Sequence, residues 1–147
     1  MDEVRSKLHE MLGDSPAADL LAAQIALETA DGKYSYGYNV GNMKASNKPG
    51  VKYQTLKTWE MENGQRVDMR EPFLAHDSLD EGLLTYVQYL DRKGLLDAAD
   101  SGDIDAYNRA LKAAGYYTAD ETKYGNILKR KLAGFAPRQQ EPTDPNG

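Results

Sequence analysis

The chain has 147 residues, no cysteine, and 18 basic against 23 acidic side chains, a net charge of −5. This length fits one domain with its own core. Acids and bases are spread along the chain, which argues against nucleic acid as a partner. The lack of thiols excludes disulfides, thiolate metal sites and a cysteine nucleophile.

The start of the chain lacks the basic residues and long apolar centre of a signal peptide. No apolar run approaches the ~20 residues that cross a bilayer, so we expect no membrane insertion. If the target lies outside the cytoplasm, we expect another machine to deliver the protein.

Apolar side chains at helical spacing predict two helices at the start of the chain. The first has Asp2 as its N-cap and ends at Gly13. The second has Ser15 as its N-cap and Pro16 at the first helical position, and it stops at Gly32. Its many alanines predict close packing on all sides.

Residues 31–50 show no period and are rich in Gly, Asn, Lys and Ser, which predicts a structured loop. After this loop, Asn63-Gly64 lies between β-forming segments, the strongest short-range signal for a hairpin. We therefore expect two strands, over residues 51–61 and 65–70.

Three more helices follow the hairpin. The segment "HDSLDEGLLTYVQYLDRKG" opens with Ser78 and Glu81 at capping-box spacing. The segment "DIDAYNRALKAAG" ends at Gly115, and "TADETKYGNILKRKLAG" is capped by Thr118 or Asp120. Together the elements predict an α+β fold that is mainly α, a helical domain with a small β-hairpin lobe.

This domain covers residues 1–135. The segment 136–147 has no apolar anchor, and we expect a disordered tail or linker there.

Glu28 lies in the last turn of the alanine-rich helix. The negative end of the helix dipole and partial burial both disfavour the ionised carboxylate, and so raise its pKa as a general acid requires. Helix C-termini favour cations, and violations of such local rules tend to mark functional sites. From spacing alone, a solvated surface glutamate remains the ordinary interpretation.

Glu60 is a second candidate acid, near the end of the first predicted strand, although a solvated turn residue is the default there. Trp59 beside it either stacks on a sugar ring or packs the hairpin. The chain has ten tyrosines but only two phenylalanines. Tyrosine is typical of carbohydrate-binding clefts, because its ring packs on the face of a sugar and its hydroxyl bonds to the sugar's edge. The candidates are Tyr34, Tyr36, Tyr38, Tyr116 and Tyr117. The three in the loop fit equally well a role in fixing the loop to the core.

Metal, nucleotide and acyl-transfer chemistry have no support in the sequence. His9 and His76 are far apart and belong to no ligand cluster. No Gly-rich phosphate loop, Gly-x-Ser-x-Gly segment or Ser/His/Asp constellation is present. We expect neither a metal nor a cofactor.

Several segments, in this order along the chain, resemble glycoside hydrolase family 73, the flagellar and autolysin-type endo-β-N-acetylglucosaminidases with a lysozyme-like fold. "ALETADG" is similar to the family's Ala-Leu-Glu-Thr-Gly-x-Gly and places the catalytic acid on Glu28. "NVGNMKA" resembles Asn-Leu-Phe-Gly-Ile-Lys-Ala and matches Asn39 and Lys44. "TWEMENG" resembles Thr-x-Glu-Tyr before a hairpin turn and places a second acid on Glu60. "AGYYTAD" resembles Ala-Gly-Tyr-Ala-Thr-Asp and places the active-site tyrosine on Tyr116.

The sequence departs from the family pattern at three places. Ala30 and Asp31 replace a glycine and an aromatic residue, and Gly41-Asn42 replaces Phe-Gly. "FLAHDS" lacks the arginine and tyrosine of the family's Phe-Arg-x-Tyr-x-Ser. Because asparagine tolerates a left-handed backbone best after glycine, we expect the loop to keep its shape while its sugar contacts change.

The resemblance implies a peptidoglycan hydrolase of the endo-β-N-acetylglucosaminidase type, which cleaves a β-1,4 bond of the glycan strand. Glu28 would be the general acid, Glu60 would activate water or stabilise positive charge, and Tyr116 would position the N-acetyl group or the developing charge. The expected substrate-binding residues are Tyr34, Tyr36, Tyr38, Asn39, Asn42, Lys44, Trp59 and Tyr117; of these, Asn39 and Lys44 fit a loop-shaping role better than chemistry.

Two alternatives stay open. A lytic transglycosylase on the same fold would need one acid and would release an anhydro sugar. A non-catalytic wall-binding module of a phage tail or secretion machine would keep the cleft without turnover. The absent signal peptide favours a bacteriophage virion protein, an endolysin or an injected effector, with phage tail or secretion-machine proteins as partners. The expected place of action is the cell wall, in the periplasm or outside the cell.

Overall fold

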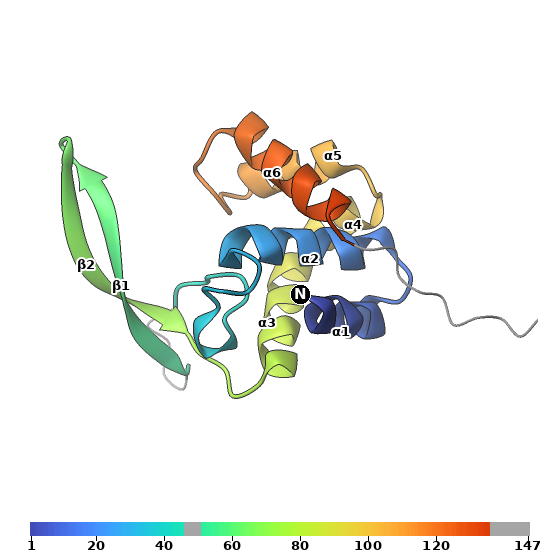
Figure 1. Ribbon diagram of the computed structural model, residues 1–147, viewed down its shortest axis with the longest axis horizontal. Coiled ribbons are helices and arrows are strands. Elements are labelled where there is room, and N and C mark those ends of the chain that lie inside the picture. The colour runs from blue at the N-terminus through green and yellow to red at the C-terminus, as the bar shows by residue number, and fades with distance from the viewer. Residues whose placement is uncertain (46–50, 136–147) are drawn as a thin grey trace, which may run out of the picture.

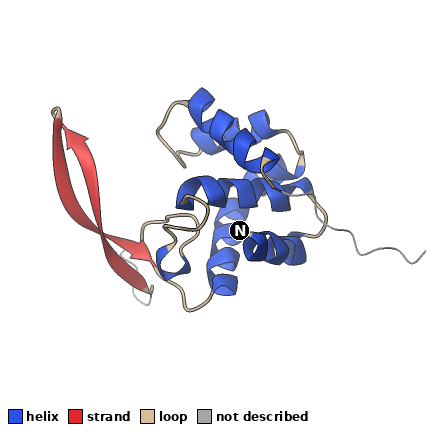
Figure 2. Ribbon diagram, viewed as in Figure 1, coloured by secondary structure: helices blue, strands red, loops and turns tan. Residues whose placement is uncertain are grey.

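The protein folds into a helical body from which a long β-hairpin projects to one side (Figures 1 and 2). The computed structural model describes residues 1–45 and 51–135, except for the Glu60 side chain. The predicted tail and part of the predicted loop, residues 46–50, lie outside the described residues. The helices are α1 Asp2–Leu12, α2 Pro16–Thr29, η1 Tyr36–Tyr38, α3 Leu79–Arg92, α4 Leu95–Asp100, α5 Ile104–Ala113 and α6 Glu121–Ala133, and the strands are β1 Tyr53–Glu62 and β2 Gln65–Leu74.

This arrangement confirms the predicted mainly α fold with a small β lobe. In the part of the chain that the structure describes, no helix is long and apolar enough to span a membrane.

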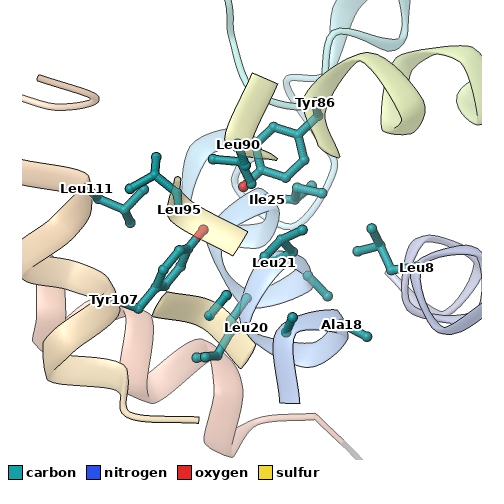
Figure 3. Packing of buried hydrophobic residues seen from close by; sticks show 14 of the residues in the cluster. Leu8, Ala18, Leu20, Leu21, Ile25, Tyr86, Leu90, Leu95, Tyr107 and Leu111 are labelled. Carbon is teal, nitrogen blue, oxygen red and sulfur yellow. The ribbon is translucent and has the colours of Figure 1, made fainter. Parts of the chain in front are cut away.

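Helix α2 is the central element of the body and contacts α1, α4 and α6. The Ser15 hydroxyl accepts a hydrogen bond from the backbone N–H of Ala17, and Pro16 opens the helix, both as predicted. The prediction of close packing on all sides is also confirmed, because ten of the fourteen α2 residues are buried. Figure 3 shows α2 enclosed by large side chains of the other helices: Leu8, Tyr86, Leu90, Leu95, Tyr107 and Leu111.

The hairpin turns at Asn63-Gly64, as predicted. Both residues have positive φ, 50° and 77°, as a two-residue type I′ turn requires. Strand β2 is longer than expected and continues through Pro72, which is tolerated because β2 is an edge strand. Its last residues also pair with the loop after α2: the N–H of Leu74 donates to the carbonyl of Met43, at 2.9 Å. This pairing joins the base of the hairpin to the loop.

Several predicted boundaries are wrong. Asp2 is the first residue of α1 and Met1 is its N-cap. Helix α2 ends at Thr29, three residues before Gly32. Of the two predicted caps of α6, Thr118 and Asp120, the structure confirms Asp120. Helix α4 was not predicted, because its six residues, LLDAAD, are too few to establish a helical period.

Candidate active site

The chain leaves helix α2 in a left-handed turn that begins two residues after Glu28. Ala30, Asp31 and Gly32 have φ values of 49°, 61° and 89°, so three residues in a row are left-handed. A left-handed residue other than glycine costs about 1–2 kcal/mol, and this strain lies at the candidate acid. The turn is held by Thr29, whose hydroxyl donates to the carbonyl of Ile25 (2.6 Å) and accepts from the N–H of Gly32 (2.9 Å).

Asp31 has a contact that the family-like pattern does not suggest. Its carboxylate forms an ion pair with Lys131 of α6, with an N–O distance of 2.9 Å. The turn after α2 is therefore fixed to the last helix.

Glu28 is half-buried at the end of α2 that points toward the hairpin side of the molecule (Figure 1). The hydroxyl of Tyr124, from α6, donates to its Oε1 at 2.7 Å. Burial raises the pKa of Glu28, and the Tyr124 hydrogen bond offsets part of that rise. The interpretation of Glu28 as a freely solvated surface residue is therefore wrong, and its raised pKa is the property that a general acid needs.

Tyr116 lies close to Glu28. Its hydroxyl donates to the carbonyl of Gly41 at 3.0 Å, and burial together with the nearby Glu28 raises the pKa of this phenol. Tyr117 lies behind the site, because its ring stacks on that of Tyr124 with centroids 3.7 Å apart. The structure thus brings Tyr116 and Glu28 together and places Tyr117 as support for Tyr124.

The three loop tyrosines expose their rings. Tyr34, Tyr36 and Tyr38 are 58%, 52% and 47% exposed, so they do not fix the loop by burial in the core. The loop is held by its backbone instead: the Gln54 side-chain amide donates to the carbonyl of Tyr36 (2.7 Å), and the N–H of His76 donates to that of Gly37 (2.8 Å). The rings are therefore free to meet a ligand.

The predicted polar residues of the loop act as structural ties. The Asn39 side chain is buried and makes two hydrogen bonds with the backbone of Met43, at 2.8 and 2.9 Å. Asn42 adopts the expected left-handed backbone, with φ 50°, and its amide donates to the carbonyl of Glu28 at 2.6 Å. Lys44 pairs with Glu71 of β2 at 3.0 Å. These ties hold the loop against both α2 and the hairpin.

Glu60 lies in the outer half of the hairpin, where its backbone is paired with Val67. This part of the hairpin stands clear of the helices (Figure 1). Trp59 is 54% exposed, and the Arg66 guanidinium lies over its ring, 5.2 Å from the centroid. The structure therefore does not bring Trp59 to the end of α2.

Sequence reasoning missed Gln24 and Tyr124. Gln24 is fully buried one helical turn before Glu28, and Tyr124 donates the hydrogen bond to that carboxylate. The signal for Gln24 was its polar side chain in a run of alanines and leucines. Tyr124 gave no signal, because it occupies an ordinary position on the buried face of its helix. Over residues 1–45 and 51–135, no three acidic or histidine side chains gather as a metal site would require.

Comparison with known proteins gives the family. No family model and no curated protein matches the sequence, but solved structures do. A mutant of the peptidoglycan hydrolase from Sphingomonas sp. A1 is 30% identical, with a TM-score of 0.71 and 90% of each chain covered. A truncated glycoside hydrolase domain of Salmonella typhimurium FlgJ is 25% identical, with a TM-score of 0.66 and coverage of 88% of this chain and 91% of that one.

The catalytic domain of the Listeria monocytogenes autolysin Auto shares the fold, with a TM-score of 0.68 at 19% identity, over 90% of this chain and 80% of that one. The identity and the coverage agree with the motifs around Glu28, Asn39 and Tyr116. The chain therefore belongs to glycoside hydrolase family 73.

Proposed function

We propose that this protein hydrolyses a β-1,4 bond in the glycan strand of peptidoglycan, as an endo-β-N-acetylglucosaminidase. The observation that carries this proposal is Glu28, a half-buried carboxyl with a raised pKa, in contact with Tyr124 and next to Tyr116. Two similar solved structures bear the names of a peptidoglycan hydrolase and a glycoside hydrolase domain, which supports the same substrate here.

Glu28 is the general acid in this proposal. Its Oε1 accepts the Tyr124 hydrogen bond, which leaves Oε2 to carry the proton to the leaving glycosidic oxygen. Because burial raises the pKa, a larger fraction of Glu28 holds its proton near neutral pH than would a solvated glutamate.

Tyr116 positions the substrate. Its own hydroxyl proton is committed to the carbonyl of Gly41, so the lone pairs of Oη remain to accept a hydrogen bond. The N–H of an N-acetyl group is the matching donor on the sugar. In this proposal, sugar rings of the substrate stack on the exposed rings of Tyr34, Tyr36 and Tyr38 along the loop.

Glu60 is the assisting carboxylate that activates water or stabilises the oxocarbenium-like charge. Its position on the projecting hairpin requires the hairpin to close over the substrate. The base of the hairpin is fixed by the Lys44–Glu71 pair, so closure would bend the outer strands. If the hairpin stays open, the acetamido group of the substrate would take over this role.

The expected place of action is the cell wall, which the hydrolase neighbours support. Those neighbours give no support to the virion-associated interpretation or to phage tail and secretion-machine partners.

Product analysis tests the reaction. Purified peptidoglycan is digested, and mass spectrometry with end-group reduction identifies the new ends. We expect reducing N-acetylglucosamine. A 1,6-anhydro end would instead establish a lytic transglycosylase, and binding without any product would establish a non-catalytic module.

The role of Glu60 is tested on the same substrate with Glu60→Gln, and Glu62→Gln is the matched control because it alters an exposed acid on the same hairpin. We expect a large loss of rate for Glu60→Gln and none for the control. Full activity of Glu60→Gln would remove the assisting role and leave Glu28 as the acid.

A further inference from the structure

The two faces of the projecting hairpin differ in exposure. Side chains alternate between the faces of a strand, so the register of β1 and β2 assigns each residue to one face. One face carries a set of exposed side chains: Lys57, Trp59, Met61, Arg66, Asp68 and Arg70. Half-buried side chains lie on the opposite face: Leu56, Thr58, Val67 and Met69. We call the exposed set the outer face of the hairpin.

The opposite face contacts the loop after α2. It includes Gln54, whose amide donates to the carbonyl of Tyr36 at 2.7 Å, and Glu71, which pairs with Lys44 at 3.0 Å. The outer face takes no part in these contacts, and this part of the hairpin stands clear of the helices (Figure 2). It is therefore separate from the site around Glu28.

The outer face forms an open groove of about 520 Å³ that contains an aromatic ring. The Trp59 ring is 54% exposed, and the Arg66 guanidinium lies over it, 5.2 Å from the centroid. Met61, which is also exposed, extends the apolar surface beside the ring. Tryptophan, methionine and arginine are enriched where proteins bind partners. The groove thus has the composition of a binding surface.

Lys57 and Arg70 lie directly opposite each other on the outer face. Like charges in such a cross-strand pair destabilise a sheet. In the part of the chain that the structure describes, neither side chain has an ion-pair partner. A carboxylate held between the two cations would remove their repulsion and form charge-assisted hydrogen bonds with both. This pair therefore points to an anionic group on the ligand.

The groove also contains one acid. Asp68 pairs with Arg66 at 3.0 Å, and because both side chains are exposed, this ion pair contributes little and a ligand can replace it. The outer face thus has three cations and one acid, although the whole chain has a net charge of −5. Asp68 would repel a uniformly anionic polymer such as nucleic acid or teichoic acid. It would attract the amino group of a ligand that has both signs of charge.

We propose that the outer face binds the stem peptide of peptidoglycan, the short peptide attached to the glycan strand. Stem peptides carry carboxylates and an amino group, as the charges of the groove require. A carboxylate binds between Lys57 and Arg70, the amino group binds Asp68, and the apolar part of the peptide packs on Trp59. This inference rests on the proposed function, because it takes peptidoglycan as the substrate.

The spacing of the groups fits an extended peptide. Trp59 and Asp68 are register partners, two residues along the strands from the Lys57–Arg70 pair. Two residues along a strand cover about 7 Å, and two residues of an extended peptide cover the same distance. One peptide can therefore meet the cations, the ring and the acid together.

A second binding surface would hold the enzyme on its polymeric substrate. Peptidoglycan has many stem peptides close to each glycosidic bond, so a peptide bound on the outer face raises the effective concentration of glycan at Glu28. The effect lowers KM for the intact polymer and leaves the chemical step unchanged.

The test uses the fluorescence of Trp59, which is the only tryptophan of the chain and so reports on this face alone. The probe is an N-acetylated stem tetrapeptide without sugar. We expect a saturable change in emission, and an affinity about tenfold weaker in Lys57→Glu. This variant places opposite charges across from each other, so its Tm should not fall and unfolding cannot explain the loss.

Lys123→Glu is the matched control, because it reverses the charge of an exposed lysine on α6, and it should bind as the wild type does. With intact peptidoglycan, we expect Lys57→Glu to raise KM with kcat unchanged. With glycan strands whose peptides have been removed, it should behave as the wild type does.

Two further probes test the chemistry of the ligand. The tetrapeptide with amidated carboxylates should bind at least about tenfold more weakly, because it has no anion for Lys57 and Arg70. Inorganic polyphosphate should also bind more weakly than the stem peptide, because Asp68 repels it. Tighter binding of polyphosphate would identify the groove as a site for anionic polymers and would overturn the proposal.

An emission that does not respond to the stem peptide, or an equal affinity in Lys57→Glu, would also overturn it. These measurements do not depend on turnover. A protein that binds the peptide but leaves peptidoglycan intact would support the outer-face site and contradict the proposed function. A protein that cleaves peptidoglycan while its Trp59 emission ignores the peptide would contradict the outer-face site alone.

Discussion

Tyr124→Phe removes a single hydroxyl group from the environment of Glu28. That hydroxyl donates to Oε1 at 2.7 Å, while the ring stacks on Tyr117 with an interplanar angle of 3°. Phenylalanine keeps the stacked ring, so we expect the variant to fold. Because the hydrogen bond lowers the pKa of Glu28 against the effect of burial, its loss must raise that pKa further.

The magnitude follows from the type of hydrogen bond. A hydrogen bond to a charged group contributes about 1.5–3 kcal/mol, and about 1.4 kcal/mol corresponds to one pKa unit. The basic limb of kcat, which reports the deprotonation of the acid, should therefore move to higher pH by roughly 1–2 units. The assay is the rate of peptidoglycan solubilisation from acidic to alkaline pH.

Tyr117→Phe is the matched control for this experiment. It also removes a hydroxyl from the stacked pair, but that hydroxyl donates to Asn108 and not to Glu28. The control should keep the basic limb of the wild type. An unmoved limb in Tyr124→Phe, or an equal shift in both variants, would refute the argument.

Three further predictions concern stability. Because the pKa of Glu28 is raised in the folded state, folded protein binds this proton more tightly than the unfolded chain does. The stability that the bound proton contributes is fully present below the ordinary pKa of 4.5 and is lost as pH rises through the pKa of the folded state. Glu28→Gln should therefore gain stability over the wild type with rising pH, measured by urea unfolding. Ala30→Gly relieves a left-handed φ of 49° and should add about 1 kcal/mol to the unfolding free energy by the same measurement. Gly82→Ala would place Cβ 2.0 Å from the carbonyl oxygen of Tyr38, so the loop must move from α3 and Tm should fall, whereas Gly134→Ala, with a φ of −76° and no atom nearer than 3.4 Å to the added Cβ, should cost far less.

The elements that the sequence predicts are those with a local cause. The Asn63-Gly64 turn needs two positive φ values, and asparagine and glycine adopt them with the least backbone strain. Ser15 and Ser78 cap their helices through hydroxyl contacts only two or three residues away. Helix α4 was not predicted because tertiary contacts, rather than a sequence pattern, determine it. Leu95 packs in the hydrophobic core, but the helix is too short to show a helical period.

The candidate site divides in the same way. Glu28 is visible in the sequence because it violates a local rule at a helix end, and the resemblance to a family strengthened the inference. Its partner Tyr124 is 96 residues away, and only the packing of α6 on α2 brings the two together. The sequence predicted Tyr117 as a sugar-binding residue because it is an aromatic residue next to Tyr116. In the fold, its ring stacks on Tyr124 instead.

The most direct test of the central claim is the turnover of Glu28→Gln on purified peptidoglycan. Glutamine keeps the size of the side chain and an acceptor for the Tyr124 hydroxyl but has no proton to give. Glu10→Gln, an exposed acid on α1, controls for the loss of one charge. We predict that Glu28→Gln folds and binds the substrate but loses its kcat by at least about a thousandfold, with Glu10→Gln fully active. Wild-type turnover in Glu28→Gln would contradict the account.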